Sequence, residues 1–303
     1  MGELNPKILH RIYFDDMAPF RDPFLRYLDT WKREMPDYKI MYWNAKTFNF
    51  PNNIWCNKCL KAQDPVFLSE YMRWKVLSMY GGMYLDADCE ILNGKKLNAL
   101  IDQLYSTDEY DCFCGVEDKT NGYPTAQTFA AKKGSALVSF MLNLYEGPLS
   151  SALWYWRQER GLIGPQLISL YFREKGFEDN HGFFVNLESP IVRAGVKVYT
   201  QDYFSPKFTT TGKTLFETDN TCVYHLFSNL NMQKVDPERQ KHRDNPLLYK
   251  EYCEYLRNLP KNEQQCTVRD SAGNIRIKRL LRMLVMHPLI FTKKVVAFLI
   301  RRW

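Results

Sequence analysis

The sequence lacks the features that mark several classes of protein. No uninterrupted apolar run reaches the roughly 18 residues that span a bilayer. Residues 1–6 carry no basic charge and no apolar stretch follows them, so we expect no secretion signal. Internal repeats and low-complexity segments are also absent from the sequence. We therefore expect a globular protein of the cytoplasm.

Paired metal-binding cysteines are missing as well. Of the eight cysteines, only Cys56 and Cys59, and Cys112 and Cys114, lie close together in the sequence. A structural zinc site needs a second pair of ligands at regular spacing, and none is evident. We expect free, buried thiols in a reducing cytosol, with a zinc site as the less favoured alternative.

The excess of positive charge is concentrated at one end of the chain. The 303 residues suffice for one large α/β domain or two small ones, with a substantial core. Residues 275–303 hold eight Lys or Arg and no Asp or Glu, so with a net charge of +7 the other residues sum to −1. A body without excess positive charge disfavours a nucleic-acid-binding protein, and we expect no nucleic-acid partner.

The basic segment alternates positive charges with short apolar runs. We expect one domain over residues 1–270 and a basic amphipathic helical tail over residues 271–303. This pattern is typical of helices that lie on an anionic membrane surface. The protein is therefore expected to be peripheral on the inner face of the membrane through residues 275–303. The alternative is a tail that packs on the domain.

Strand-like and helix-like segments alternate from the N-terminus, which favours an α/β fold with a mostly parallel central sheet. Residues 7–14 and 38–43 are rich in β-formers, and residues 22–34 place apolar side chains at helical spacing. Further along, the sequence predicts strands at 127–132 and 196–200 and helices at 135–146 and 165–175.

A helix is predicted over about residues 65–80. Asp64 is a candidate N-cap, and Gly81-Gly82 ends the helix before a strand at 83–85. The helix is roughly 22 Å long, and a strand of six residues that continues into the following residues spans roughly 20 Å, so the strand runs back along the helix. Glu70 and Arg73 share a helix face and are expected near the strand's end, the alternative being a surface ion pair.

The triplet Asp86-Ala87-Asp88 follows that strand directly. In an extended chain alternate side chains point to the same side, so the two carboxylates face one point in space. Carboxylate oxygens suit Mg2+ or Mn2+, which in turn bind phosphate oxygens. The alternative is a solvated acidic turn.

These residues carry a family resemblance. Ser69, Glu70 and Arg73, followed by Gly81-Gly82-Met83-Tyr84-Leu85-Asp86-Ala87-Asp88, resemble the sugar-nucleotide-binding region of DXD-containing glycosyltransferases of family 32. That family includes yeast mannosyltransferases and bacterial capsule enzymes, with the clostridial glucosylating toxins as distant relatives. Further segments are similar to the same family in order along the chain: Pro6-Lys7-Ile8, His10, Tyr13, Trp31, Pro36-Asp37-Tyr38, Trp43, Gly164-Pro165, Tyr224-His225 and Ser228.

The resemblance implies a GT-A type, Rossmann-like fold and a metal-dependent, retaining glycosyltransferase. Such an enzyme moves a hexose from a UDP- or GDP-hexose, with UDP favoured, to a glycan or lipid-linked oligosaccharide in surface polysaccharide (capsule) synthesis. The alternative is a non-catalytic protein that binds nucleotide sugars or carbohydrate on the same scaffold.

The resemblance also implies roles for individual residues. Asp86, Asp88 and His225 would bind Mn2+ or Mg2+, and Glu70 and Arg73 would contact the hydroxyls of the transferred sugar. The expected catalytic residues are Glu70, Arg73, Asp86 and Asp88. The expected donor-binding residues are Tyr13, which would stack on the base, and His10, Ser69, Tyr84, Gly164 and Gln127.

Two positions depart from the family pattern. Glu70 stands where the family usually has Asp, so its carboxylate reaches one methylene further, and Tyr13 stands where the family usually has Trp. Both leave the donor sugar open.

Several candidates keep a structural alternative. His10 lies in an apolar strand and is favoured as a core histidine, whereas Gln127 could also face the acceptor. Gly164 opens a helix whose free amides could meet a phosphate or a sugar hydroxyl. Trp154 and Trp156 could shape an acceptor groove or belong to the core. No pattern surrounds the remaining histidines, which we expect to be structural: His181, His242 and His287.

Overall fold

The computed structural model describes residues 4–17, 22–158, 160–177, 184–207, 216–228 and 246–258. The chain divides into two units, Met1–Asn258 and Leu259–Trp303. The second unit lies outside the described residues, as do His181, His242 and His287. The predictions made for the tail and for these histidines therefore stay predictions. No helix of the described residues is long and apolar enough to cross a membrane.

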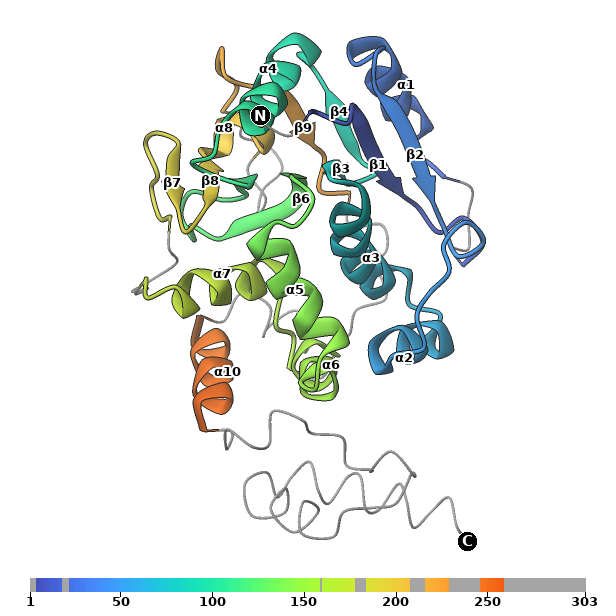
Figure 1. Ribbon diagram of the computed structural model, residues 1–303, viewed down its shortest axis with the longest axis vertical. Helices are drawn as coiled ribbons and strands as arrows, with labels where there is room; N and C mark the ends of the chain where they lie inside the picture. Colours follow the sequence, from blue (N-terminus) through green and yellow to red (C-terminus); the bar gives the residue numbers. More distant parts are fainter. Residues whose placement is uncertain are drawn as a thin grey trace, which may run out of the picture. The chain divides into compact units, whose positions relative to one another are not determined.

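Strands and helices alternate along the described chain (Figure 1). The main sheet contains β1 (Ile8–Ile12), β2 (Lys39–Trp43), β3 (Gly82–Leu85), β5 (Cys112–Val116), β6 (Pro124–Ala131), β7 (Ile191–Arg193) and β8 (Val196–Tyr199). A small second sheet contains β4 (Cys89–Ile91) and β9 (Val223–His225). The helices are α1 (Leu25–Glu34), α2 (Ile54–Ala62), α3 (Pro65–Tyr80), α4 (Gly94–Ser106), α5 (Ala136–Glu146), α6 (Ser150–Gln158), α7 (Gly164–Glu174), α8 (Gln201–Phe204) and α10 (Pro246–Asn258).

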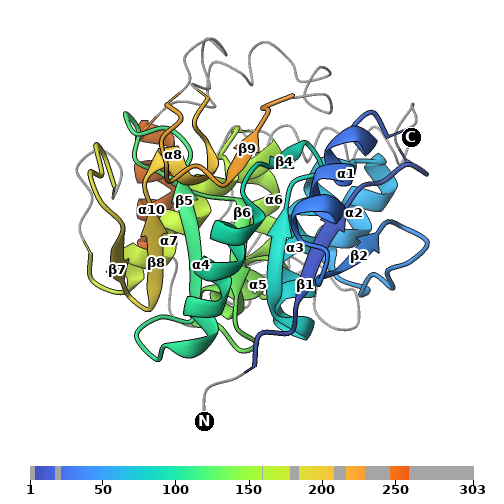
Figure 2. The same ribbon diagram turned by 90° about the horizontal axis from the view of Figure 1, so that it is seen from above.

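The main sheet is mixed but mostly parallel in direction. Its order is β2-β1-β3-β6-β5-β8-β7, and the strands from β7 to β1 follow one another across the view of Figure 2. The pairs β1/β2, β1/β3 and β5/β8 are parallel, whereas β3/β6, β5/β6 and β7/β8 are antiparallel. Only β6 and β7 therefore run against the others in the described part of the sheet. The predicted α/β class is confirmed, and the arrangement is consistent with a GT-A type fold.

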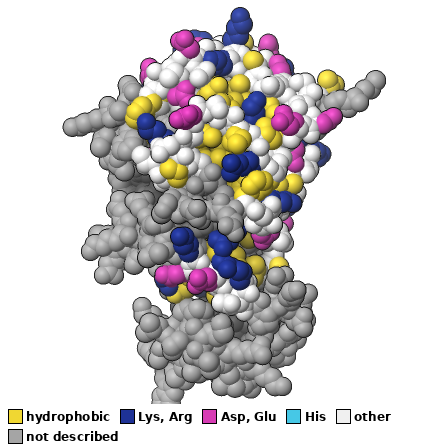
Figure 3. Space-filling view, turned by 90° about the vertical axis from the view of Figure 1, so that its left-hand side faces the viewer, with side chains coloured by type: hydrophobic (Ala, Val, Ile, Leu, Met, Phe, Trp, Pro, Cys, Tyr) yellow, Lys and Arg dark blue, Asp and Glu magenta, His cyan; other side chains and the backbone are white. Residues whose placement is uncertain are grey.

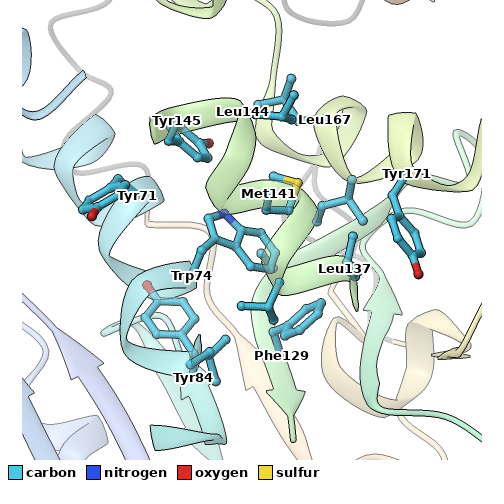
Figure 4. Packing of buried hydrophobic residues seen from close by; sticks show 14 of the residues in the cluster. Tyr71, Trp74, Tyr84, Phe129, Leu137, Met141, Leu144, Tyr145, Leu167 and Tyr171 are labelled. Atoms are coloured by element: carbon cyan, nitrogen blue, oxygen red, sulfur yellow. The ribbon is translucent and has the colours of Figure 1, made fainter. Parts of the chain in front are cut away.

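Each face of the sheet carries its own hydrophobic core. Alternation along β3 sends Tyr84 to the core under α3, α5 and α7, and Met83 and Leu85 to the core under α1 and α4. In the first core, Trp74 of α3 packs edge-on against Phe129 of β6 with ring centroids 5.0 Å apart, next to α5 (Figure 4). Helices on both faces explain why β3, β5 and β6 are buried on both sides.

The strands and helices predicted from sequence within the described residues are present, whereas the predicted helical tail lies outside them. The strands expected at 7–14, 38–43, 83–85, 127–132 and 196–200 are β1, β2, β3, β6 and β8, and the helices expected at 22–34, 65–80, 135–146 and 165–175 are α1, α3, α5 and α7, with shifts of a few residues at their ends. The other helices and strands were not predicted.

The turn from α3 into β3 positions the acidic triplet. Asp64 caps α3 by accepting a hydrogen bond from the amide of Phe67 (3.1 Å), as its N-cap position predicts. The turn needs glycine, because Gly82 has φ +88° and a Cβ there would lie 2.7 Å from the carbonyl oxygen of Ile8. His10 Nε2 lies 2.8 Å from Gly81 O, which ties this turn to β1.

Charges of both signs are mixed on the face of the body shown in Figure 3. Lys and Arg side chains alternate there with Asp, Glu and hydrophobic ones. This mixture agrees with the near-neutral charge of residues 1–274.

Candidate active site

The acidic triplet lies in a tight turn between β3 and β4, so the extended conformation assumed from the sequence is wrong. The amide of Cys89 donates to Asp86 O (3.0 Å), which closes the turn. Asp86 N donates to Gln127 O of β6 (2.8 Å), and Trp31 Nε1 donates to Cys89 O (2.7 Å). The turn is thus fastened on both sides, and its two carboxylates nevertheless converge.

The point of convergence is His225. Its Nε2 lies 3.2 Å from Asp88 Oδ1 and 3.7 Å from Asp86 Oδ2. The histidine is brought there by the β4/β9 pairing, in which Cys89 is opposite His225. The structure therefore places the three predicted metal ligands together, although His225 comes from the other end of the described chain.

The segment that follows β9 forms hydrogen bonds with Asp88 of the turn. Leu226 N donates to Asp88 O (3.3 Å), and Ser228 N donates to Asp88 Oδ2 (3.0 Å). Between them, Phe227 has φ +50°, an uncommon conformation for a bulky residue. This backbone bend aims the Ser228 amide at the carboxylate, so Asp88 is held by an amide as well as by His225.

Asp88 and His225 shift one another's pKa. Burial would raise the pKa of Asp88, but the His225 ring and the Ser228 amide outweigh it and hold that pKa well below its usual range. Burial would lower the pKa of His225, but Asp88 and then Asp86 outweigh it and raise that pKa. Each of the two side chains therefore favours the charged form of the other.

A divalent cation fits the same place. The donors are two hard carboxylates and an imidazole, a set that suits Mg2+ or Mn2+. Neighbouring ligands of an ion with bonds of about 2.1 Å stand about 3 Å apart, close to the 3.2 Å between Asp88 and His225. The Nδ1 atom of His225 is buried without a hydrogen-bond partner among the described residues, so only Nε2 faces the carboxylates.

Cys89 is a rival third ligand. Its Sγ and the ligand atoms of Asp88 and His225 all lie within 4.8 Å of one another. Burial raises the pKa of the Cys89 thiol well above its usual value, and Sγ lies 3.8 Å from the carbonyl oxygen of Gln127. Sulfur suits a hard cation less well than a carboxylate oxygen does, so Asp86 is the better candidate for the third position.

Arg73 meets the triplet as the helix–strand geometry predicted. Its Nη2 lies 3.4 Å from Asp86 Oδ1, and its guanidinium carbon lies 4.8 Å from the centre of the Tyr84 ring. The Tyr84 hydroxyl donates to the same Asp86 oxygen (2.5 Å). Arg73, Tyr84 and Asp86 therefore form one connected group at the end of β3.

Glu70 does not join that group. It forms a two-point ion pair with Arg157 of α6, in which Arg157 Nε donates to Glu70 Oε2 (3.1 Å) and Nη2 donates to Oε1. The Tyr145 hydroxyl approaches Oε2 at 3.5 Å. The expectation that Glu70 faces Asp86 and Asp88 is corrected, since its carboxylate turns to α6. Arg157 had no signal in the sequence because 87 positions separate it from Glu70.

Two of the predicted donor-binding residues lie where a ligand can reach them. The partly exposed Tyr13 follows β1, and its ring meets Phe24 edge-on at 6.1 Å. Gly164 opens α7 opposite Glu70, since a Cβ on Gly164 would lie 3.7 Å from Glu70 Oε1 and within 4 Å of nothing else in the described part of the chain. Both positions keep the roles expected of them as predictions.

Tyr84, the third, belongs to the group at Asp86 described above, and the remaining three are occupied by structural contacts. His10 is fully buried and not brought to the site, because Nε2 meets Gly81 O and Nδ1 accepts from Trp43 Nε1 (3.2 Å). The Ser69 hydroxyl donates to Val66 O within α3 (2.7 Å). The buried Gln127 side chain bonds the hydroxyls of Thr125 and Ser205, and its main-chain oxygen holds the triplet turn. These three support the site rather than line it.

The two candidate groove tryptophans belong to the aromatic packing around α6. Trp154 is partly buried and packs edge-on against Trp55, with ring centroids 5.3 Å apart. Trp156 is buried beside Tyr252 of α10 at 5.2 Å.

Comparison with known proteins bears on the N-terminal third. Residues 22–107 match the family described as glycosyltransferase sugar-binding region containing DXD motif. This match covers less than a third of the chain and includes Arg73 and the triplet. It supports the superfamily of DXD-containing glycosyltransferases without distinguishing family 32 within it. No curated protein matches the chain.

Two solved structures show a weak likeness. One, described as a glycosyltransferase involved in the glycosylation of the major capsid of PBCV-1, is 12% identical, covers 78% of this chain and 98% of its own, and has a TM-score of 0.42. The PaToxG glycosyltransferase is 15% identical, covers 56% of this chain and 69% of its own, and has a TM-score of 0.40. We conclude nothing from likenesses at this level. It is residues 22–107, with the triplet and Arg73, that resemble the sugar-binding region of DXD-containing glycosyltransferases.

Proposed function

We propose that this protein is a metal-dependent, retaining glycosyltransferase that moves a hexose from a nucleotide sugar, with UDP-hexose favoured. The observation that carries the proposal is the convergence of Asp86, Asp88 and His225 on one point, with Arg73 beside it. Both acidic residues and Arg73 belong to the region that matches the DXD family.

The acidic cluster would hold the donor's diphosphate. Asp86, Asp88 and His225 would bind Mn2+ or Mg2+, which when bound stabilises negative charge on the departing diphosphate as a Lewis acid. The Ser228 amide and the Trp31 indole keep the turn in place, so these ligands need little rearrangement.

The sugar would lie between Arg73 and Glu70. Arg73 offers guanidinium donors and Glu70 offers carboxylate acceptors, which together orient the ring by its hydroxyls. The bond from the anomeric carbon to the diphosphate oxygen breaks, and its electron pair leaves with the diphosphate. The acceptor hydroxyl oxygen forms the new bond to that carbon and gives up its proton to the leaving phosphate or to water. Tyr13 would present its ring to the nucleotide base.

Retention, the hexose and the acceptor rest on the family resemblance. A glycan or lipid-linked oligosaccharide of a surface polysaccharide is the acceptor that this resemblance favours. The basic residues 275–303 would bring the enzyme to the anionic inner face of the membrane, where lipid-linked acceptors lie.

The test is Mn2+-dependent turnover of donors. Purified protein is incubated with UDP-glucose, UDP-galactose, UDP-N-acetylglucosamine and GDP-mannose, and the released nucleoside diphosphate is measured with Mn2+ and with EDTA. We expect turnover of at least one donor with Mn2+, lost in Asp88→Ala and kept in Glu109→Ala, which removes an exposed carboxylate elsewhere. Unchanged turnover in Asp88→Ala would refute the proposal, and donor binding without turnover would favour a binding protein.

A further inference from the structure

The carboxylate of Glu70 is held by a partner outside its own helix. Glu70 and Arg73 are one helical turn apart on α3 and could pair with each other. Instead, Arg73 pairs with Asp86, and Glu70 pairs with Arg157 of α6. The two ion pairs are thus separate, and the one with Glu70 points away from the metal ligands.

Arg157 is itself fixed in three directions. Its Nη1 donates to Leu162 O, in the loop between α6 and α7, while Nε and Nη2 donate to the two oxygens of Glu70. The guanidinium carbon lies over the Phe67 ring, 4.9 Å from its centre. The side chain is only 5% exposed. A guanidinium that is hydrogen-bonded at both edges and packed on an aromatic ring has little freedom to move. It therefore also restricts the carboxylate of Glu70 to which it is bonded.

Space remains beside the fixed carboxylate. The Glu70 side chain is 15% exposed, three times as much as Arg157. Gly164 stands beside Oε1, where a Cβ would contact Glu70 Oε1 at 3.7 Å and meet nothing else of the described residues within 4 Å. Each carboxylate oxygen can accept more than one hydrogen bond, so Glu70 can still accept from a ligand in this space.

We propose that Arg157 is a positioning residue that aims Glu70 at the hydroxyls of the bound sugar and thereby sets which hexose is accepted. This proposal rests on the proposed function above. The longer Glu side chain needs such an anchor, because its extra torsion would otherwise let the carboxylate swing toward Arg73. The open space at Gly164 would receive the hydroxyl-bearing edge of the sugar.

A purely structural role for Arg157 makes a different prediction. Gln158, the next residue on α6, also docks this helix on α3, since its Nε2 donates to Asp64 Oδ2 (2.9 Å). Gln158→Leu removes that docking bond without touching Glu70, which makes it a matched control. If Arg157 only docks α6, both changes lower stability and neither alters the choice of sugar.

The experiment compares wild type, Arg157→Lys, Arg157→Gln and Gln158→Leu. For each protein we measure the midpoint of thermal unfolding, the affinity for UDP with Mn2+, and kcat and KM for hydrolysis of UDP-glucose and UDP-galactose, which differ at one hydroxyl. Arg157→Lys keeps the charge and is the variant best able to fold. Both Arg157 variants should bind UDP within about twofold of wild type. Their kcat/KM for the preferred sugar should fall about 10- to 100-fold, the effect of losing one charge-assisted hydrogen bond.

Two further outcomes support the proposal. The preference between the two sugars should shrink toward unity in both Arg157 variants and stay unchanged in Gln158→Leu. In a Glu70→Gln background, Arg157→Lys should change kcat/KM less than twofold, because its effect passes through Glu70. An unchanged preference in a folded, UDP-binding Arg157→Lys would overturn the proposal, as would full additivity with Glu70→Gln. If wild type turned over no nucleotide sugar, the proposed function would fail first.

Discussion

The fully buried His10 predicts a specific loss of stability in acid. Burial is the main cause that lowers the pKa of His10 from 6.5 to about 4, with the bond to Gly81 O opposing it. Because Nδ1 accepts from Trp43 Nε1, the ring in the folded protein is neutral with its proton on Nε2. The unfolded chain therefore takes up a proton at higher pH than the folded protein does. The contribution of the neutral His10 to the free energy of unfolding should be present above pH 6.5 and should fall as the pH drops from there toward 4.

The size of this loss follows from the two pKa values. Between about pH 7.5 and about pH 5, protonation of the unfolded chain at His10 costs the folded state about 2 kcal/mol. The bond from Nε2 to Gly81 O itself persists across this window, because the folded ring stays neutral until the pH approaches 4.

The assay is urea unfolding of wild type and His10→Gln at a series of pH values in this window. Other groups titrate in both proteins, so the difference in unfolding free energy between them isolates His10. We expect the unfolding free energy of wild type, relative to that of the variant, to fall by about 2 kcal/mol from the upper to the lower end of the window. A difference that stays constant within about 0.5 kcal/mol would show that His10 is not a buried neutral histidine, and the reasoning would be refuted.

Three other changes probe the turn, the site and the tail. Gly82→Ala should cost about 2 kcal/mol or more, because φ is +88° and the new Cβ would press on Ile8 O; a thermal midpoint equal to wild type would contradict this. Arg73→Lys should lower kcat/KM for the preferred donor about tenfold while Mn2+ binding persists, since an ammonium keeps the charge near Asp86 but loses the planar fork; unchanged kinetics would exclude a sugar contact. Deletion of residues 275–303 should abolish sedimentation with anionic vesicles while turnover of a soluble donor remains; vesicle binding by the truncated protein would show that the tail is not the anchor.

Local signals in the sequence were enough to predict α3 and the return of β3. The N-cap at Asp64 and the glycines at 81 and 82 act over a few residues, so their positions could be read directly. The lengths of the helix and strand then brought Arg73 to Asp86. These are the parts of the fold in which geometry follows from neighbours in the chain.

The remaining parts depend on distant segments. The sequence of the triplet does not decide its conformation, because Asp-x-Asp suits a strand or a turn equally. The hydrogen bonds with Gln127 and Trp31 fix it as a turn. The three-residue strands β4 and β9 are too short for a periodic pattern. Arg157 and Glu70 are 87 positions apart in the sequence, and they pair because α6 packs on α3. Family resemblance supplied His225, whose approach to Asp88 no local rule predicts.

The most direct test of the metal-diphosphate site is calorimetry of UDP with and without Mn2+. We predict that Mn2+ tightens UDP binding at least tenfold in wild type, since the ion joins the diphosphate to Asp86, Asp88 and His225. Asp88→Asn should bind UDP with the same weak affinity in either condition. Equal affinities for wild type with Mn2+ and with EDTA would contradict the central claim.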